Sequence, residues 1–141
     1  EDFFTSGIKE YQKRIEGFSK FSIVEVKEVN TTDISKNIEE EGKNILSKIA
    51  DDEFVITLEI KGKAIDSVEL AKLIEEKLTY GMSKITFVIG GSNGLSESVS
   101  KRSDYQLSFS KFTFPHQLMR LILTEQIYRA LTIIKNKEYH K

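Results

Sequence analysis

Two loops and a short tail contain the residues whose types and spacing could do chemistry. The loop GGSNGL (90–95) follows an apolar run, and its three glycines let backbone N–H groups approach a ligand closely. The loop SFSKFTFPHQL (108–118) combines hydroxyl groups with phenylalanine rings ahead of a helix start, which suits an adenosine. The tail EYHK (138–141) carries one of the two histidines of the chain.

Each of these features also has an ordinary structural interpretation. GGSNGL has neither the Gly-Lys-Ser/Thr of a phosphate loop nor the G-x-G-x-x-G fingerprint, and alone it is equally consistent with a tight turn between strand and helix. The phenylalanines of the second loop could simply cap a core, which the pattern alone favours. His116 is typical of a helix-capping or packing residue, and His140 of a frayed tail. With two histidines and no cysteine, the sequence predicts no metal site.

The elements that must position these residues alternate between helices and strands. Apolar periodicity predicts helices over about 2–15, 34–49, 66–80 and 115–134, the third beginning with a capping box formed by Asp66 and Glu69. Runs rich in apolar and β-branched residues predict strands over 21–29, 54–60, 85–91 and 105–109. KGK (61–63) is expected to be a turn, and Ser96 to start a short helix.

This alternation indicates an α/β fold with a mostly parallel sheet flanked by helices. Ligands of such sheets bind at the carboxyl ends of the strands, which here are the ends of FVITLEI, ITFVIGG and YQLSFS. The sequence therefore directs attention to the same two loops, and to the end of the strand beginning at Phe54.

Length and composition predict one ordinary globular domain over residues 1–141. The absence of cysteine favours a reducing compartment, the cytoplasm by default, and no apolar run has the length of a membrane span. The formal net charge of −1 gives no overall support for binding nucleic acid, so an RNA-binding protein with this sequence would need a local basic surface.

Four segments, taken together, resemble the bacterial large-subunit ribosomal RNA methyltransferase H family of the SPOUT class. They are VITLEIKGK (55–63), FVIGGSNGL (87–95), LSFSKFTFPHQLMRLILTEQIYRA (107–130) and EYHK (138–141), in the family's order and at similar spacing. The resemblance implies methylation of a pseudouridine at N3 in 23S ribosomal RNA, with S-adenosyl-L-methionine as cofactor. It also implies a homodimer, a C-terminal trefoil knot, and ribosomal RNA or the assembled ribosome as partner.

The resemblance also implies roles for individual residues. The cofactor contacts would be Leu58, Gly90, Phe109, Ser110, Lys111, Phe112, Thr113 and Phe114. His140 and Tyr139 would be catalytic, and Arg120, Arg129 and Lys141 would bind RNA. The family's first strand, of the type K-I-x-I-x-x-V-G-K-x-K, has no match here, so an N-terminal strand is expected to be missing from the chain.

These assignments suggest a catalytic mechanism, and two alternative functions must be compared with it. The N3 imide of pseudouridine is nucleophilic only after its proton leaves, so a base, or a cation that stabilises the anion, should help. Histidine is the side chain best suited to accept a proton at neutral pH, which makes His140 the first candidate. One alternative is a non-catalytic RNA-binding or ribosome-associated module with the same fold. A nucleotide-binding domain is disfavoured by the two missing fingerprints.

Overall fold

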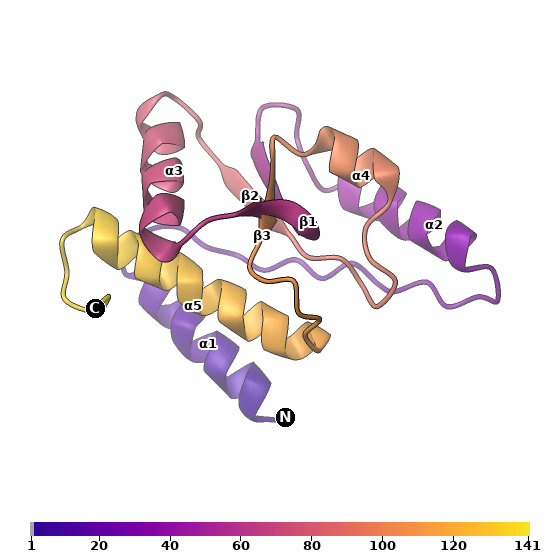
Figure 1. Cartoon of the computed structure of the whole chain (residues 1–141), viewed down its shortest axis with the longest axis horizontal. Helices are drawn as coiled ribbons and strands as arrows, with labels where there is room; N and C mark the ends of the chain where they lie inside the picture. Colours follow the sequence, from indigo (N-terminus) through magenta and orange to yellow (C-terminus); the bar gives the residue numbers. More distant parts are fainter. Residues whose placement is uncertain (1) are drawn as a thin grey trace. The chain divides into compact units, whose positions relative to one another are not determined.

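The computed structural model describes residues 2–141, which form five helices and three strands (Figure 1). The chain divides into two compact units. The sheet unit comprises residues 24–64 and 77–112, and the helical unit comprises residues up to 23, 65–76 and those from 113 onward. Within residues 2–141, no helix combines the length and apolar character that crossing a membrane requires.

The sheet unit contains three parallel strands in the order β2-β1-β3, which confirms the predicted α/β class. The strands are β1 (Phe54–Ala64), β2 (Ile85–Val88) and β3 (Tyr105–Ser108). Thr57 of the central strand lies opposite Val88, and Leu58 lies opposite Leu107, so the carboxyl ends of all three strands reach one edge of the sheet. The parallel arrangement therefore brings together the segments that follow these three strands.

Two helices of the sheet unit cover its core. They are α2 (Ile34–Leu46) and α4 (Glu97–Arg102), which pack on each other. The buried valines Val55, Val88 and Val99 form a cluster on which Ile45 and Leu95 pack. Ser96 caps α4 by accepting a hydrogen bond from the Val99 N–H at 3.2 Å, as its place in the sequence predicts.

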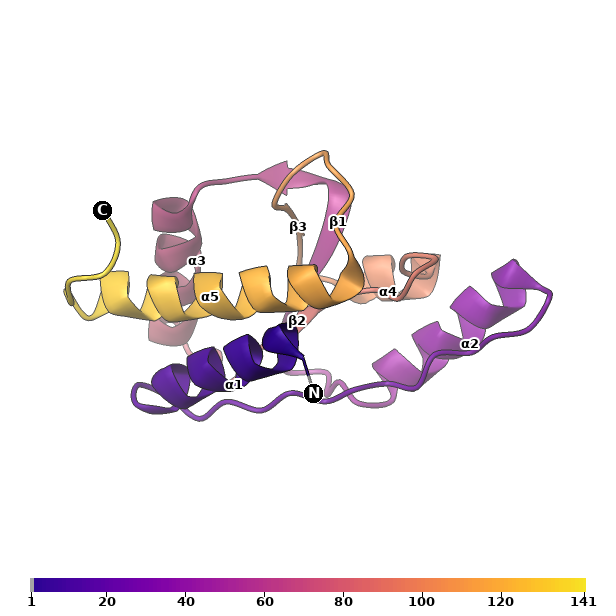
Figure 2. The ribbon, with the colours of Figure 1, turned by 90° about the horizontal axis from the view of Figure 1, so that it is seen from below.

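The helical unit consists of α1 (Phe3–Glu16), most of α3 (Ser67–Thr79) and α5 (His116–Ile134). Helix α1 runs along α5, as both views show (Figure 2). The predicted capping box of α3 is confirmed, because the Glu69 N–H donates to Asp66 at 2.8 Å and the Asp66 N–H donates back to Glu69 at 3.0 Å.

Two predicted elements are wrong. Residues 21–29 form no strand, although their composition favours extended backbone. Val24 is 63% exposed, and none of the strands among residues 2–141 pairs with this stretch, which shows that β-branched residues alone do not make a strand. The KGK segment is not a turn either, since β1 continues through Gly62 to Ala64 with an irregularity between Leu58 and Lys63.

Gly62 lies where β1 passes close to the backbone of β3. A Cβ atom at this position would lie 2.7 Å from the carbonyl carbon of Gln106 and 2.8 Å from that of Leu107. Gly62→Ala is therefore expected to lower the free energy of unfolding by about 1–3 kcal/mol, a typical cost of overpacking, as measured by urea denaturation. The matched control is Lys63→Ala at the exposed neighbouring position, and equal stability of the two variants would contradict the close approach.

Candidate functional site

Three of the predicted cofactor residues belong to one edge of the sheet unit. Leu58 lies in the central strand, Gly90 lies two residues beyond the end of β2, and Phe109 directly follows β3. Because neighbouring strands are about 4.8 Å apart, this register places Gly90 and Phe109 on either side of the chain that continues from Leu58. The backbone groups beyond the strand ends at this edge can form hydrogen bonds to a ligand.

The glycine loop folds tightly on itself. The N–H of Gly94 donates to the carbonyl of Gly91 at 3.0 Å, and Gly94 has a φ of +85°, which favours glycine. A Cβ atom at Gly90 would lie 2.9 Å from the carbonyl carbon of Gly94 and 3.0 Å from Cγ of Leu95. The loop therefore leaves no room for a side chain at Gly90.

Two carboxylates of the same unit lie beside the glycine loop, and one of them binds it. Glu28 accepts hydrogen bonds from the backbone N–H of Ser92 at 3.1 Å and from its hydroxyl at 2.7 Å. Glu41 accepts from the N–H of Val29 at 2.8 Å. A Cβ atom at Gly91 would lie 3.1 Å from an oxygen of each carboxylate, so a side chain there would require the two carboxylates to shift by a few tenths of an ångström.

The loop after β3 is organised by its hydroxyl groups. Ser108 donates to the carbonyl of Ser110 at 3.2 Å, and the Ser110 hydroxyl accepts from the N–H of Phe112 at 2.9 Å. Phe112 is 78% exposed, and Lys111 is exposed beside it. An exposed phenylalanine does not cap a core, which weakens the ordinary interpretation of this residue and leaves an apolar surface for a ligand. Thr113 and Phe114, the last two residues of the predicted set, belong to the helical unit.

In the helical unit, a defined turn ends α5 and reverses the chain. The N–H of Asn136 donates to the carbonyl of Ile133 at 3.2 Å, and the N–H of Lys137 donates to that of Thr132 at 2.8 Å. Asn136 has a φ of +54°. These bonds and this left-handed residue form a Schellman motif, so the tail is not frayed but directed back along the helix.

The conformation of Asn136 leads to a prediction. Asn136→Val places a β-branched residue in the left-handed region, which should lower the free energy of unfolding by about 1–2 kcal/mol and displace the tail. Urea denaturation would measure the first effect, and limited proteolysis of residues 137–141 would measure the second. Asn136→Gly is the matched control, because glycine adopts this conformation without strain. A valine variant that matched the glycine variant in both measurements would show that the turn does not hold the tail.

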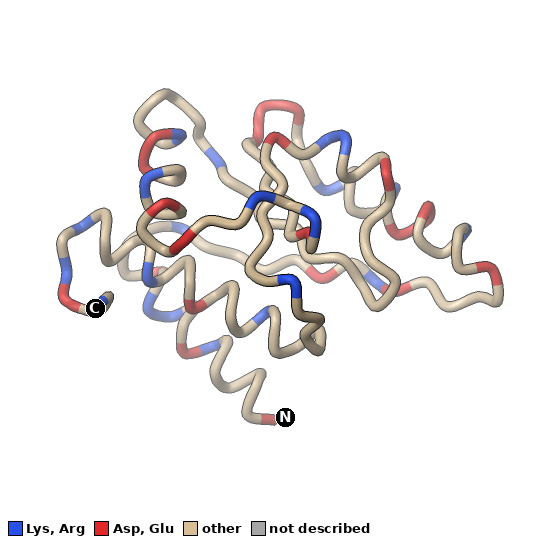
Figure 3. Tube along the Cα trace, in the orientation of Figure 1, with Lys and Arg blue, Asp and Glu red and all other residues tan. Residues whose placement is uncertain are grey.

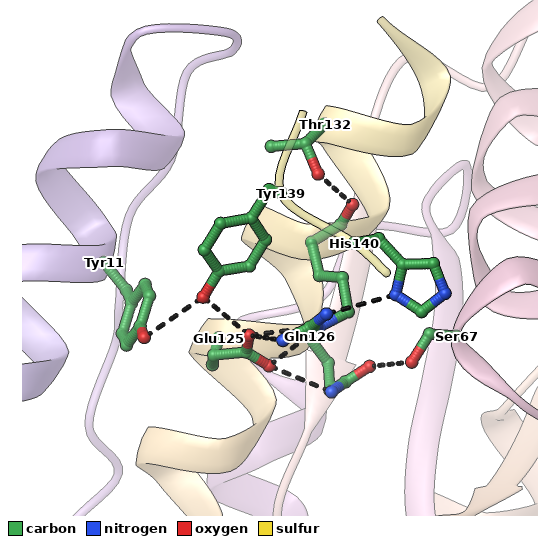
Figure 4. Close-up of polar contacts among 8 residues, drawn as sticks. Tyr11, Ser67, Glu125, Gln126, Thr132, Tyr139 and His140 are labelled. Carbon is green, nitrogen blue, oxygen red and sulfur yellow. Dashed lines mark hydrogen bonds and ion pairs between the residues drawn. The ribbon is translucent and has the colours of Figure 1, made fainter. Parts of the chain in front are cut away.

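The returning tail meets an ion pair on α5 (Figure 4). Arg129 donates to Glu125 through Nη2 at 2.6 Å and through Nε at 3.1 Å. The hydroxyl of Tyr139 donates to the same carboxylate at 2.8 Å and lies 3.3 Å from the hydroxyl of Tyr11. Since Tyr139 has a single O–H group, Tyr11 donates to it.

Tyr139 is held by its ring as well as by its hydroxyl. The ring contacts that of Tyr128 edge to face, with centroids 4.7 Å apart, and the Arg129 guanidinium lies over it at 4.8 Å. Burial raises the pKa of Tyr139, and its hydrogen bonds with Tyr11 and Glu125 raise it further. The phenol therefore remains protonated at neutral pH and acts as a donor, not as a base.

His140 follows Tyr139 and is exposed, and its Nδ1 atom lies 3.1 Å from Nη1 of Arg129. The structure thus brings both predicted catalytic residues and Arg129 into one cluster. Arg120 lies elsewhere on α5 and donates to Gln117 at 3.2 Å, and Lys141 is exposed after His140. Figure 3 shows lysine and arginine interleaved with acidic residues along the chain, in agreement with its nearly balanced charge.

Glu125, which binds both Arg129 and Tyr139, is not among the site residues predicted from the sequence. The signal was present, because Glu125 and Arg129 are four residues apart on a helix made mainly of apolar residues. At this spacing the two side chains lie on the same helical face, and a carboxylate in such a helix needs a partner.

Comparison with known proteins agrees with the architecture. A family model described as predicted SPOUT methyltransferase matches residues 1–140. A protein of Limosilactobacillus reuteri (strain DSM 20016) named ribosomal RNA large subunit methyltransferase H is 52% identical, covering 100% of this chain and 92% of the relative. Proteins of the same name from Carboxydothermus hydrogenoformans and Listeria welshimeri are 48% and 49% identical over the same shares.

Proposed function

This chain belongs to the SPOUT methyltransferase family, and we propose that it methylates a pseudouridine of large-subunit ribosomal RNA at N3, using S-adenosyl-L-methionine. RNA methylation is the activity that the family and the names of the relatives support. The target nucleotide and the atom methylated rest on the resemblance of the four motifs. The observation that carries the proposal is the pairing of a glycine loop with an exposed aromatic loop at the carboxyl edge of a parallel sheet.

The residues at this edge fit the cofactor. Gly90 provides close backbone approach where a Cβ atom would be 2.9 Å from Gly94. Phe109 and Phe112 offer apolar surface to an adenine ring, and the backbone beyond Leu58 offers polar groups to its edge. Ser110, Lys111, Thr113 and Phe114 complete the proposed set. When bound, S-adenosyl-L-methionine supplies an electrophilic methyl group.

The side chains of the tail are proposed to act on the target base. In the overall reaction N3 gains the methyl group and loses its proton, so the protein must hold the base while negative charge develops on the imide. His140 is exposed and held by Arg129, which suits a contact with the base. Tyr139 supports the tail through its ring and its hydroxyl. Arg120 and Lys141 are the proposed contacts to RNA phosphate.

The assembly is part of the same proposal. The resemblance implies that the active protein is a homodimer with a C-terminal trefoil knot, acting in the cytoplasm on ribosomal RNA or on the assembled ribosome. Sedimentation of the purified chain would test the dimer directly. A monomer at micromolar concentration would contradict that part of the proposal.

The activity is tested by two measurements. Mass mapping of ribosomal RNA from cells with and without the gene should show the loss of one methyl group from one large-subunit pseudouridine. Calorimetry should show heat with S-adenosyl-L-methionine and none with ATP. Unchanged RNA together with no binding of S-adenosyl-L-methionine would favour the non-catalytic RNA-binding module instead.

A further inference from the structure

The Glu125 carboxylate is fully engaged within the helical unit. It accepts hydrogen bonds from Arg129 at 2.6 Å, from Tyr139 at 2.8 Å and from Gln126 at 2.9 Å. Ser67 of α3 donates to the carbonyl oxygen of Gln126 at 2.6 Å and so fixes the orientation of that amide. Arg129 is therefore held by a carboxylate that is itself held from several sides (Figure 4).

Arg129 has a fixed charge and limited freedom. Its side chain is 24% exposed, and the hydrogen bond to Glu125 raises its pKa, so it remains a guanidinium under all working conditions. A guanidinium has five N–H donors and no acceptor. Whatever atom binds to Nη1 must therefore provide a lone pair.

The atom near Nη1 is Nδ1 of His140, at 3.1 Å. Because Nδ1 must accept, it carries no proton, and the neutral ring carries its proton on Nε2. If both nitrogens were protonated, two N–H groups would face each other and this bond would be lost. Among the described residues 2–141, Nε2 makes no hydrogen bond, and the His140 side chain is exposed.

We propose that the Glu125–Arg129 ion pair is a positioning device that fixes His140 as the Nε2-protonated tautomer, so that His140 presents a hydrogen-bond donor to the target base. The inference rests on the proposed function for the identity of that base, but the tautomer and its cause do not depend on it. Arg129 acts through His140 and is a positioning residue. This assignment differs from the phosphate contact that the resemblance suggests for Arg129.

A donor suits the chemistry of the imide. When the N3 proton leaves to water, the negative charge spreads onto the two carbonyl oxygens beside N3. An Nε2–H group directed at one of these oxygens stabilises the charge as it develops. His140 then needs to accept no proton, which agrees with the engagement of its other nitrogen by Arg129.

The tautomer can be observed directly by NMR. His116→Gln leaves His140 as the single histidine of the chain, and two-bond ¹H–¹⁵N correlation spectra distinguish the two tautomers without substrate. The expected result is one Nε2-protonated species in this background and a mixture of tautomers after Arg129→Met. Lys135→Met is the matched control, because it removes a cation from the end of the same helix and should leave the spectrum unchanged.

The proposal is overturned if the parent carries its proton on Nδ1, or if Arg129→Met leaves the spectrum unaltered. Should Arg129→Met fail to fold, Arg129→Lys keeps the charge but not the planar fork, and it should give the same mixture. A confirmed tautomer in a protein that methylates nothing would refute the proposed function and leave this inference standing.

Kinetics separate positioning from phosphate binding. If Arg129 is a positioning residue, Arg129→Lys should lower kcat about tenfold or more, since small misplacements at a reacting centre are costly. The affinity for RNA should stay unchanged. If Arg129 instead contacts an RNA phosphate, the variant should bind RNA more weakly and retain its kcat. The slope of the logarithm of the binding constant against the logarithm of salt concentration should then fall by about one unit. The second pattern would overturn the proposal.

Discussion

His140→Ala is expected to lower kcat for methyl transfer roughly a hundredfold to a thousandfold, the usual cost of removing a donor that stabilises developing charge. The variant should fold normally, because the side chain is exposed and, among residues 2–141, hydrogen-bonds only to Arg129. Its affinity for S-adenosyl-L-methionine, measured by calorimetry, should equal that of the parent protein. Single-turnover methylation of ribosomal RNA gives the rate of the chemical step.

His140→Gln is the informative companion variant. Its amide N–H can take the place of Nε2–H, so a donor role predicts recovery of part of the activity lost in His140→Ala. A base role predicts no recovery, because an amide does not accept a proton at neutral pH. Wild-type turnover in His140→Ala would remove His140 from the mechanism altogether.

Local chemistry made several elements predictable from the sequence. The capping box of Asp66 and Glu69 and the cap at Ser96 depend on residues three apart, and both are formed as expected. The apolar runs starting at Phe54 and Ile85 are also strands, since parallel strands are covered on both faces. These features require information from only a few neighbouring residues.

The two wrong predictions depend on distant residues. Residues 21–29 have strand composition, but a strand also needs a partner with free backbone groups, and no strand in the described part of the chain pairs with them. Gly62 resembles a turn glycine, yet it is required by the backbone of Gln106 and Leu107, more than 40 positions away along the chain. Pairing partners and close approaches of this kind are not encoded in local pattern.

The candidate site also contains residues that local sequence predicts and residues whose position depends on the folded chain. The loop residues Gly90 and Phe109 follow strands, so the topology rule for parallel sheets makes them candidates without any family resemblance. The position of the tail could not be predicted locally, because it depends on a left-handed Asn136 that turns Tyr139 and His140 back toward Glu125. Asparagine is one of the few residues that tolerate this conformation, but its presence alone does not show that the turn forms.

Gly90→Val is expected to weaken binding of S-adenosyl-L-methionine about ten- to hundredfold. The new Cβ atom would lie 2.9 Å from the carbonyl carbon of Gly94 and 3.0 Å from Cγ of Leu95, so the loop must open or shift. Distortion of this kind costs about 1–3 kcal/mol. If this cost applies only to the cofactor-bound protein, it corresponds to the expected loss of affinity. Calorimetry with S-adenosyl-L-methionine measures the effect.

Asn93→Val is the matched control, because it adds the same side chain to the exposed tip of the same loop. It should bind the cofactor with nearly the affinity of the parent protein, and circular dichroism should show both variants folded. Gly90→Ala should lie between the parent and the valine variant, since it introduces the same Cβ contact without the two methyl groups. Retained affinity in a folded Gly90→Val protein would place the cofactor away from the glycine loop and leave Phe109 and its neighbours without their proposed partner across β1.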